Sequence, residues 1–167
     1  MSTNRRPDAH RRLKRGPNGR FMCRCGCGVE VAPPRRTFNS DECVERYKIR
    51  NDPGYVRNLV EQRDHGVCAL CGLDTEALRR QIDYRPEAYR ELLVAKGFRA
   101  TAYCSGDFWA ADHIIPVAEG GGGCGLDGYR TLCTPCHKRV TAELVQRLAE
   151  QRRLAKESAR QPLFQDT

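Results

Sequence analysis

The sequence predicts a small α+β domain whose hydrophobic core is modest. The chain has 167 residues, of which 40% are hydrophobic and 7% aromatic, so it suffices for one ordinary domain or for a smaller domain with extensions. Helical patterns surround two short strand candidates, and no alternating βαβ pattern is present. Ten cysteines are many for this length. Because no apolar N-terminal segment indicates secretion, metal ligation explains the cysteines better than disulfides do.

The first part of the chain predicts a tail, a cysteine-rich segment and two helices. Residues 1–20 are charged and contain turn-forming residues, which indicates a disordered basic tail. The cysteine-rich segment, 21–50, leads into a short helix with an asparagine, serine or aspartate of residues 39–41 as its N-cap. Pro53 suits the first position of the next helix, which is expected to end near Asp64.

The rest of the chain predicts helices on either side of a pair of short strands. Capping and breaking residues place two helices at about 74–82 and 86–96. Short strand candidates lie at 110–115, which Pro116 ends, and at 126–132, which a glycine breaks. A long helix then begins near residue 134 and carries apolar residues at helical spacing.

The net charge of +8 is concentrated at the two ends of the chain. Residues 1–20 carry seven basic residues and one acidic residue, and residues 137–160 carry seven basic and three acidic residues. Residues 21–136 carry fifteen basic and sixteen acidic residues. Basic ends around a neutral body favour a polyanionic partner, nucleic acid first, although charged runs are often only solvated. The sequence predicts no membrane span. Without a secretory signal we expect an intracellular location, cytoplasmic if the source is a bacterium or phage.

Two CxxC pairs predict a structural zinc site. Cys68 and Cys71 form one tight knuckle, and Cys133 and Cys136 form the other. Each knuckle offers two thiolates, and together they complete a tetrahedral four-cysteine set. Sixty-one residues separate the pairs, so a zinc ion here would join two distant segments. A thioredoxin-like redox pair is the alternative for one knuckle, and the missing βαβ pattern disfavours it.

The N-terminal cysteines predict a second zinc site with an unusual ligand pattern. Three cysteines lie within five residues as CxCxC, and the alternative is one pair of ligands beside reduced spectator thiols. Cys104 and Cys124 have no paired histidine, so neither is a candidate nucleophile. The predicted ligands of the second site are Cys23, Cys25, Cys27 and Cys43.

Asp112, His113 and His137 are candidates for a hydrolytic site. His137 directly follows Cys136, so zinc bound there also fixes the backbone of His137. Neighbouring residues on a strand face opposite sides, so Asp112 and His113 do not easily bind one ion. Asp112 and His137 together offer few ligands, as suits a catalytic cation with open positions, while His113 stays free as a general base. The alternative is that Asp112 and His113 are only polar residues at the end of a strand, and that His137 is only a residue at the start of a helix.

The central motifs resemble the HNH endonuclease family of the four-cysteine type. They read WAADHIIPV, EGGGG and LDGYRTLCTPCHK, and the similarity covers roughly residues 37–142. The resemblance implies a ββα-metal (His-Me finger) core, in which two short strands and a helix surround one catalytic metal. It also implies that Asp112 and His137 ligate Mg²⁺ or Mn²⁺, that His113 deprotonates the attacking water, and that the knuckle cysteines hold a structural zinc.

The implied activity is that of a metal-dependent DNA endonuclease or nickase, which hydrolyses a phosphodiester to a 5′-phosphate and a 3′-hydroxyl. The nuclease domain is then expected at 51–142 and a helical basic extension at 143–167. The family's middle asparagine falls at Gly128, so Asp127 or a backbone carbonyl is expected to orient His113 instead. Asn39 stands at a position where the resemblance implies a cysteine.

Three basic residues are candidates for DNA phosphate contacts, which carry no sequence information. For Lys138 and Arg139, the alternative is that they are only part of a solvated helix face. Two other functions remain as alternatives: a zinc-stapled nucleic-acid-binding module impaired in catalysis, and a zinc domain that binds proteins through its last helix. The candidate phosphate contacts are Arg130, Lys138 and Arg139.

Overall fold

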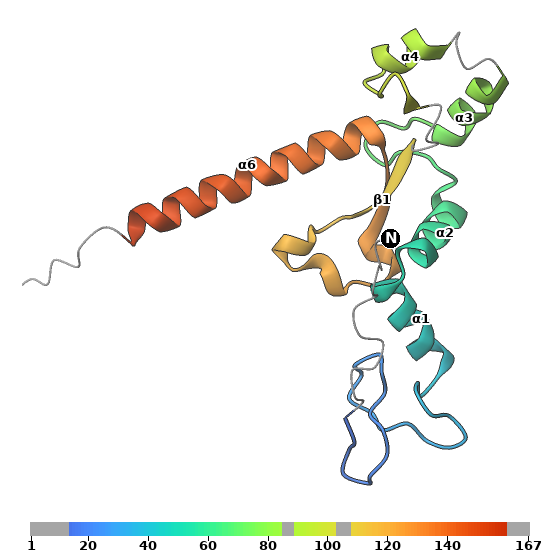
Figure 1. The fold of residues 1–167 in the computed structure, drawn as a ribbon, viewed down its shortest axis with the longest axis vertical. Coiled ribbons are helices and arrows are strands. Elements are labelled where there is room, and N and C mark those ends of the chain that lie inside the picture. Colours follow the sequence, from blue (N-terminus) through green and yellow to red (C-terminus); the bar gives the residue numbers. More distant parts are fainter. Residues whose placement is uncertain (1–13, 85–88, 103–107, 160–167) are drawn as a thin grey trace, which may run out of the picture. The chain divides into compact units, whose positions relative to one another are not determined.

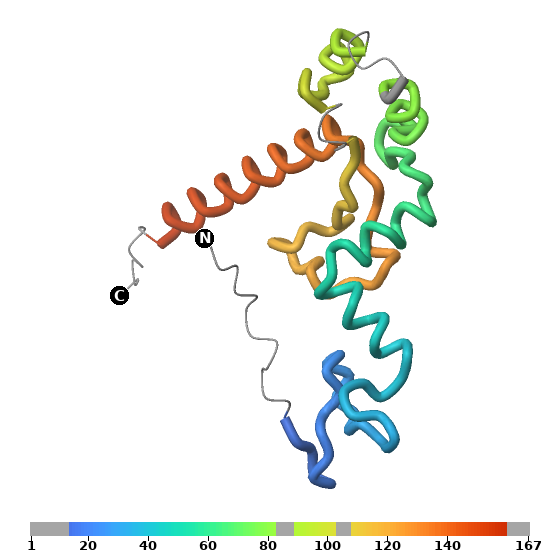
Figure 2. Tube along the Cα trace, turned by 45° about the vertical axis from the view of Figure 1, so that its right-hand side comes forward, coloured from blue at the N-terminus to red at the C-terminus, as the bar shows by residue number. Residues whose placement is uncertain are grey.

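The computed structural model describes residues 14–84, 89–102 and 108–159. The chain separates into two compact units, Met1–Val56 and Arg57–Thr167 (Figures 1 and 2). The described residues combine helices with a two-stranded sheet in the C-terminal unit, so the predicted small α+β class is confirmed.

The core of the N-terminal unit consists mainly of sulfur-bearing side chains. Little apolar area is buried in such a core, so bonds from the thiols to a metal ion are expected to supply much of its stability. In Figure 2 the blue tube that precedes the first helix follows a series of loops. The buried residues of this sulfur-rich cluster are Cys23, Cys25, Val31 and Cys43, against which Cys27, Phe38 and Tyr47 pack.

Two helices follow these loops at the predicted places. The helix α1 spans Asp41–Asn51, and the hydroxyl of Ser40 caps it by accepting the backbone N–H of Cys43 at 3.3 Å. The helix α2 spans Pro53–Asp64 and therefore begins at the predicted proline. His65 and Gly66 follow α2 in the left-handed region, at φ 51° and 71°, and so end it.

The structure differs from the predicted disordered tail at the end of residues 1–20. Residues 1–13 lie outside the described residues, but Lys14 onward forms a turn. The Met22 N–H donates to the Lys14 carbonyl at 2.8 Å, and Arg15 forms an antiparallel bridge with Phe21. The Arg15 guanidinium also lies 4.4 Å from the centre of the Phe21 ring. The composition of residues 1–20 could not indicate this pairing, because the partners Phe21 and Met22 lie just beyond that segment.

The C-terminal unit contains an antiparallel pair of strands. Strand β1 spans Trp109–His113 and β2 spans Tyr129–Cys133. The register sets Asp112 opposite Arg130 and His113 opposite Tyr129. Both strands differ from the prediction, because residues 114–115 leave the ladder before Pro116 and residues 126–128 form a 3₁₀ turn instead of a strand. In Figure 1 the strands lie beside the start of the last helix.

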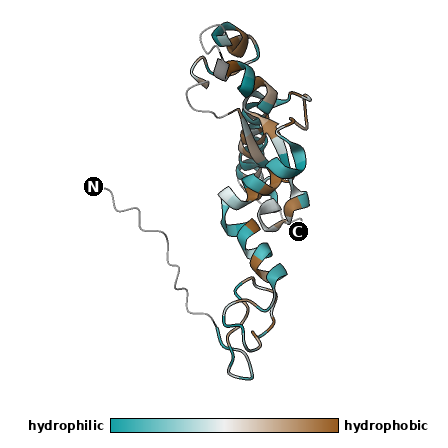
Figure 3. Ribbon diagram, turned by 90° about the vertical axis from the view of Figure 1, so that its right-hand side faces the viewer, coloured by the Kyte–Doolittle hydropathy of each residue, from teal (hydrophilic) through white to brown (hydrophobic). Residues whose placement is uncertain are grey.

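Helices and short turns complete this unit. Asp74 caps α3 as predicted, since its Oδ1 accepts the Ala77 N–H at 2.8 Å. The described part of the predicted 86–96 helix ends before Gly97, at φ 81°. Hydrophilic and hydrophobic residues alternate along the helices (Figure 3). The bounds are α3 Thr75–Tyr84, α4 Arg90–Ala95, η2 Val117–Glu119, η3 Gly121–Gly123, η4 Leu126–Gly128 and α6 Thr134–Ser158.

The core of the C-terminal unit joins β2 to the helices α3 and α4. It includes two of the knuckle cysteines, so the predicted zinc site lies at the edge of this core. No residue of α6 is buried. Within the described ranges, each helix is too short or too polar to span a bilayer. The buried core residues are Cys68, Leu78, Ile82, Leu93, Phe98, Ala102, Phe108, Leu132 and Cys133.

The end of α2 holds β2 through a charged pair. The Arg63 guanidinium donates to the carbonyls of Leu126 at 3.0 Å and Tyr129 at 2.7 Å. Asp64 Oδ2 accepts both the backbone N–H and the hydroxyl of Thr131, at 3.1 and 2.9 Å. The hydrogen bonds from Arg63 and then Thr131 lower the pKa of Asp64.

We expect Asp64→Asn to lower the free energy of unfolding by about 1–3 kcal/mol at neutral pH, because the amide cannot accept all of these hydrogen bonds. The folded pKa of Asp64 is lowered, so its contribution is full above the unfolded pKa and is lost as pH falls through the folded pKa. Urea denaturation of zinc-loaded protein should give the same difference from wild type throughout pH 5–8. Glu61→Gln, at an exposed position one turn earlier, is the control. A difference that fades within this window contradicts the assignment.

Candidate functional site

The four cysteines of the two knuckles come together in the structure. The Sγ atoms of Cys68, Cys71, Cys133 and Cys136 all lie within 4.8 Å of one another, and those of Cys71 and Cys133 are 3.6 Å apart. Zinc–sulfur bonds of about 2.3 Å in a tetrahedron separate the sulfurs by about 3.8 Å. All four thiols are free. The donor set therefore fits one structural zinc ion.

Backbone hydrogen bonds shape the first knuckle and attach it to the sheet. The Cys68 N–H donates to the Leu73 carbonyl and the Gly72 N–H to the Cys68 carbonyl, both at 2.9 Å. Gly72 has φ 71°, a left-handed conformation that glycine adopts without strain. The Ala69 N–H donates to the Thr131 carbonyl on β2, also at 2.9 Å. The knuckle is thus held next to the strand that carries the second pair.

The pKa of Cys68 in this cluster is lowered, which favours metal binding. Burial of Cys68 opposes ionisation, but hydrogen bonds from the backbone of Cys133, Cys71 and Leu70 prevail and lower the pKa of Cys68 to about 6. Zinc binds the thiolate rather than the thiol. The lowered pKa of Cys68 therefore favours the form that zinc binds.

The N-terminal cysteines form a second cluster. The Sγ atoms of Cys23, Cys25, Cys27 and Cys43 also lie within 4.8 Å of one another. The Ser40 hydroxyl, and then Cys25, lower the pKa of Cys43 to about 6 by hydrogen bonding. This donor set also fits one structural zinc ion.

Asn39 also contacts this cluster. Its backbone N–H donates to Cys23 Sγ at 3.3 Å. A hydrogen bond to sulfur stabilises the thiolate that a metal needs. Asn39 thus supports the cluster through its backbone, and Cys43 supplies the fourth sulfur.

Asp112 and His137 lie opposite each other at the junction of β1 and α6. His137 Nε2 is 3.9 Å from Asp112 Oδ1. A cation about 2.1 Å from each donor fits between these two atoms. The Asp112 side chain is 17% exposed and that of His137 42%, so the pair is held on one side and open to solvent on the other. The arrangement suits a divalent ion that keeps free positions for water and phosphate.

The other oxygen of the Asp112 carboxylate is occupied by Arg130. Its Nε and Nη2 donate to Asp112 Oδ2 at 3.1 and 3.0 Å across the sheet. Sequence reasoning considered Arg130 only as a phosphate contact and missed this pair, because the strand register was unknown. Lys138 and Arg139 are exposed in the first turns of α6. Their contact with DNA stays a prediction.

His113 ends β1 and lies against an aromatic ring. Its centroid is 4.3 Å from that of Tyr129, with 43° between the ring planes. The Ile114 N–H donates to the Gly128 carbonyl at 2.8 Å, so a backbone carbonyl does hold the residue next to His113. Asp127 is exposed on η4, and its charge acts on Arg63. The orientation of the His113 ring by Asp127 or by a backbone carbonyl stays a prediction.

Comparisons with known proteins agree with these motifs. Residues 99–143 match the family model of the HNH endonucleases. The DNA annealing helicase and endonuclease ZRANB3 of Mus musculus is 37% identical over 157 residues, which is 82% of this chain and 15% of the relative. The Homo sapiens protein of that name is 35% identical over 127 residues, 70% of this chain and 12% of the relative. The chain therefore spans only a small part of these relatives.

A solved structure extends the similarity to the fold. The crystal structure of the human ZRANB3 HNH domain matches with a TM-score of 0.52 and 34% identity. The match covers 62% of this chain and 98% of that domain. The resemblance noted in the motifs is thereby confirmed over a complete domain. The chain belongs to the HNH endonuclease family.

Proposed function

We propose that the chain is a metal-dependent DNA endonuclease or nickase that hydrolyses phosphodiester bonds. The observation that carries the proposal is the carboxylate–imidazole pair of Asp112 and His137, 3.9 Å apart and open to solvent, beside His113. The relatives' names describe endonucleases, and residues 99–143 match the family model of the HNH endonucleases. The proposed organisation keeps a nuclease domain at 51–142, a cysteine-rich segment before it and a helical extension after it.

Each residue of the site has a distinct proposed role. Asp112 and His137 hold Mg²⁺ or Mn²⁺, which when bound stabilises charge on the phosphate and on the leaving 3′-oxygen. His113 takes a proton from the attacking water, whose oxygen forms a new bond to phosphorus as the bond to the 3′-oxygen breaks, and the departing 3′-oxygen takes a proton from solvent. The products are a 5′-phosphate and a 3′-hydroxyl. Arg130 keeps the Asp112 carboxylate in place through Oδ2.

The surroundings supply affinity and rigidity. Lys138 and Arg139 are proposed to contact DNA phosphates, which adds salt-dependent affinity without sequence choice. Zinc in the two cysteine clusters is proposed to be structural. Gly128 favours a second candidate function, because a module without a side chain there can bind nucleic acid and fail to cleave it.

A plasmid-nicking assay with added Mg²⁺ or Mn²⁺ tests the proposal. The wild-type protein should convert supercoiled plasmid to open-circular or linear form. Asp112→Ala and Asp112→Asn should lose most of this activity, because either change removes a charged ligand of the divalent ion. Glu143→Gln, at an exposed acid on α6, is the matched control and should cleave normally. Salt-sensitive DNA binding without nicking under any divalent ion would instead favour the binding module.

A further inference from the structure

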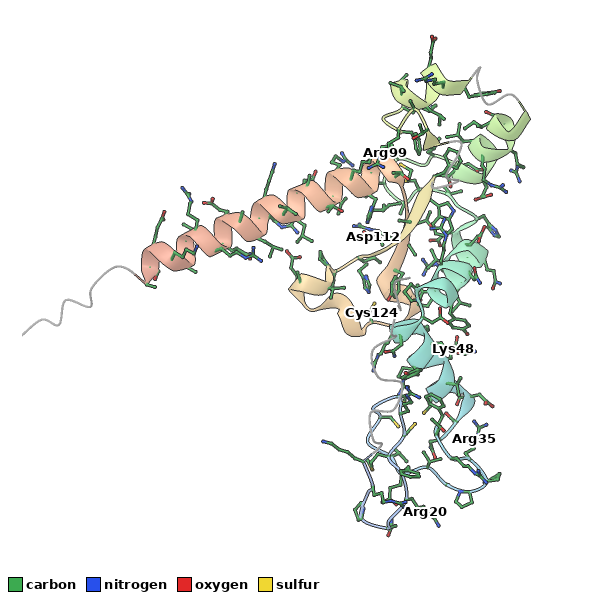
Figure 4. The ribbon with its side chains drawn as sticks, in the orientation of Figure 1. Arg20, Arg35, Lys48, Arg99, Asp112 and Cys124 are labelled. Carbon is green, nitrogen blue, oxygen red and sulfur yellow. The ribbon has the colours of Figure 1, made fainter. Side chains whose placement is uncertain are left out.

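Cys124 lies in the connection between β1 and β2, next to Gly128. A Cβ atom built at Gly128 would lie 2.3 Å from the Cys124 Cβ and 2.5 Å from its Sγ. Real Cβ atoms essentially never come so close to another heavy atom. Cys124 therefore occupies the space that a side chain at position 128 would need. Figure 4 shows Cys124 in the connection that follows β1, the strand that carries Asp112.

The Cys124 thiol contacts the aromatic ring at the start of β2. The Cys124 side chain lies close enough to the Tyr129 hydroxyl to shift the pKa of that group. Burial, followed by the charge and the hydrogen bond of Cys124, raises the pKa of Tyr129. Tyr129 is only 8% exposed, and its backbone carbonyl accepts from Arg63 Nη2 at 2.7 Å. Tyr129 is thus fixed both at its hydroxyl and at its backbone.

The fixed ring lies against His113. The two residues are partners in the strand register, and their ring centroids are 4.3 Å apart. A neighbouring ring at this distance limits the rotation of an imidazole about its side-chain bonds. Unlike a hydrogen bond, this contact does not occupy either imidazole nitrogen. Both nitrogens stay available for proton transfer.

We propose that Tyr129 is the positioning residue for His113 and that Cys124, in the space left by Gly128, fixes Tyr129 for this task. The proposal rests on the proposed role of His113 as general base. It predicts that removing the Tyr129 ring frees the imidazole, and that Tyr129→Phe, which keeps the ring, retains most of the effect.

The first experiment is independent of catalysis. In ¹H NMR spectra of the zinc-loaded protein, the ring of Tyr129 should displace the His113 imidazole proton signals. The signals should return toward the free-histidine position in Tyr129→Leu and stay displaced in Tyr129→Phe. Tyr55→Leu, at a half-buried tyrosine on α2, is the control. Displaced signals that persist in Tyr129→Leu would overturn the proposal.

The second experiment separates positioning from DNA binding. Tyr129→Leu should lower kcat by about tenfold to a hundredfold, as small misplacements of a catalytic group do, with little change in KM for DNA. Tyr129→Phe should restore most of kcat, and Cys124→Ala should lower it less than Tyr129→Leu does. A rise in KM at unchanged kcat would contradict a positioning role.

Two further results keep the test decisive. If Tyr129→Leu does not fold, Tyr129→Val replaces it, because valine also removes the ring and suits a strand, so it should free the His113 signals in the same way. If the wild-type protein cleaves no DNA, the proposed function fails, while the NMR signals still decide whether Tyr129 holds His113.

Discussion

Replacing His113 with alanine is expected to slow DNA cleavage by about 10²–10⁴-fold, the usual loss when a general base is removed. The zinc content and the folded state should not change, because His113 is in neither cysteine cluster. Single-turnover cleavage of plasmid with excess enzyme gives the rate, and a metal determination on the same sample gives the zinc content.

A second histidine supplies the control for this experiment. His65 follows α2 in the left-handed region at φ 51°, and asparagine tolerates that conformation. His65→Asn should therefore cleave DNA at the wild-type rate. Cleavage by His113→Ala at that same rate would remove His113 from the mechanism, whereas loss of activity together with loss of zinc would show that the fold had failed.

Replacing Cys133 with serine is expected to unfold the C-terminal unit. Cys133 is 2% exposed and belongs both to the zinc cluster and to the hydrophobic core. Structural zinc contributes on the order of 10 kcal/mol in small domains, comparable to the whole stability of a typical domain. Circular dichroism should show lost structure, cleavage should cease, and the zinc content should fall by one ion per chain.

Two other cysteines provide the controls for this change. Cys124→Ser removes a thiol that belongs to neither cluster, so the zinc content should stay at the wild-type value. Cys27→Ser should lose zinc from the N-terminal cluster and leave the C-terminal unit folded. Full zinc content in Cys133→Ser would contradict the ligand assignment, and unfolding of the C-terminal unit by Cys27→Ser would contradict the separation of the two units.

Features set by local sequence were predictable. The CxxC pairs indicate a metal cluster because zinc geometry limits which spacings serve, and the structure brings all four sulfurs together. Pro53 and Asp74 mark helix starts through effects confined to one turn, and both helices begin there. The Asp-His motif beside a zinc knuckle was enough to nominate Asp112, His113 and His137.

Features that depend on register or on distant partners were not predictable. Whether Arg130 faces Asp112 depends on how the strands align, and a shift of one residue would have turned it to the other face. Arg63 reaches Tyr129 from 66 positions away in the chain. In the sequence, Gly128 indicates only that the family's middle asparagine is missing. The structure shows that Cys124 occupies the space beside it.

The placement of the two sets of thiols has a consequence for synthesis on the ribosome. All four sulfurs of the N-terminal cluster lie between Cys23 and Cys43, so this unit can take up zinc while most of the chain is still unmade. The other cluster is incomplete until Cys136 has emerged, and His137 is the very next residue added. Since domains fold as units during translation, the proposed cleavage site cannot be assembled before His137 has been added.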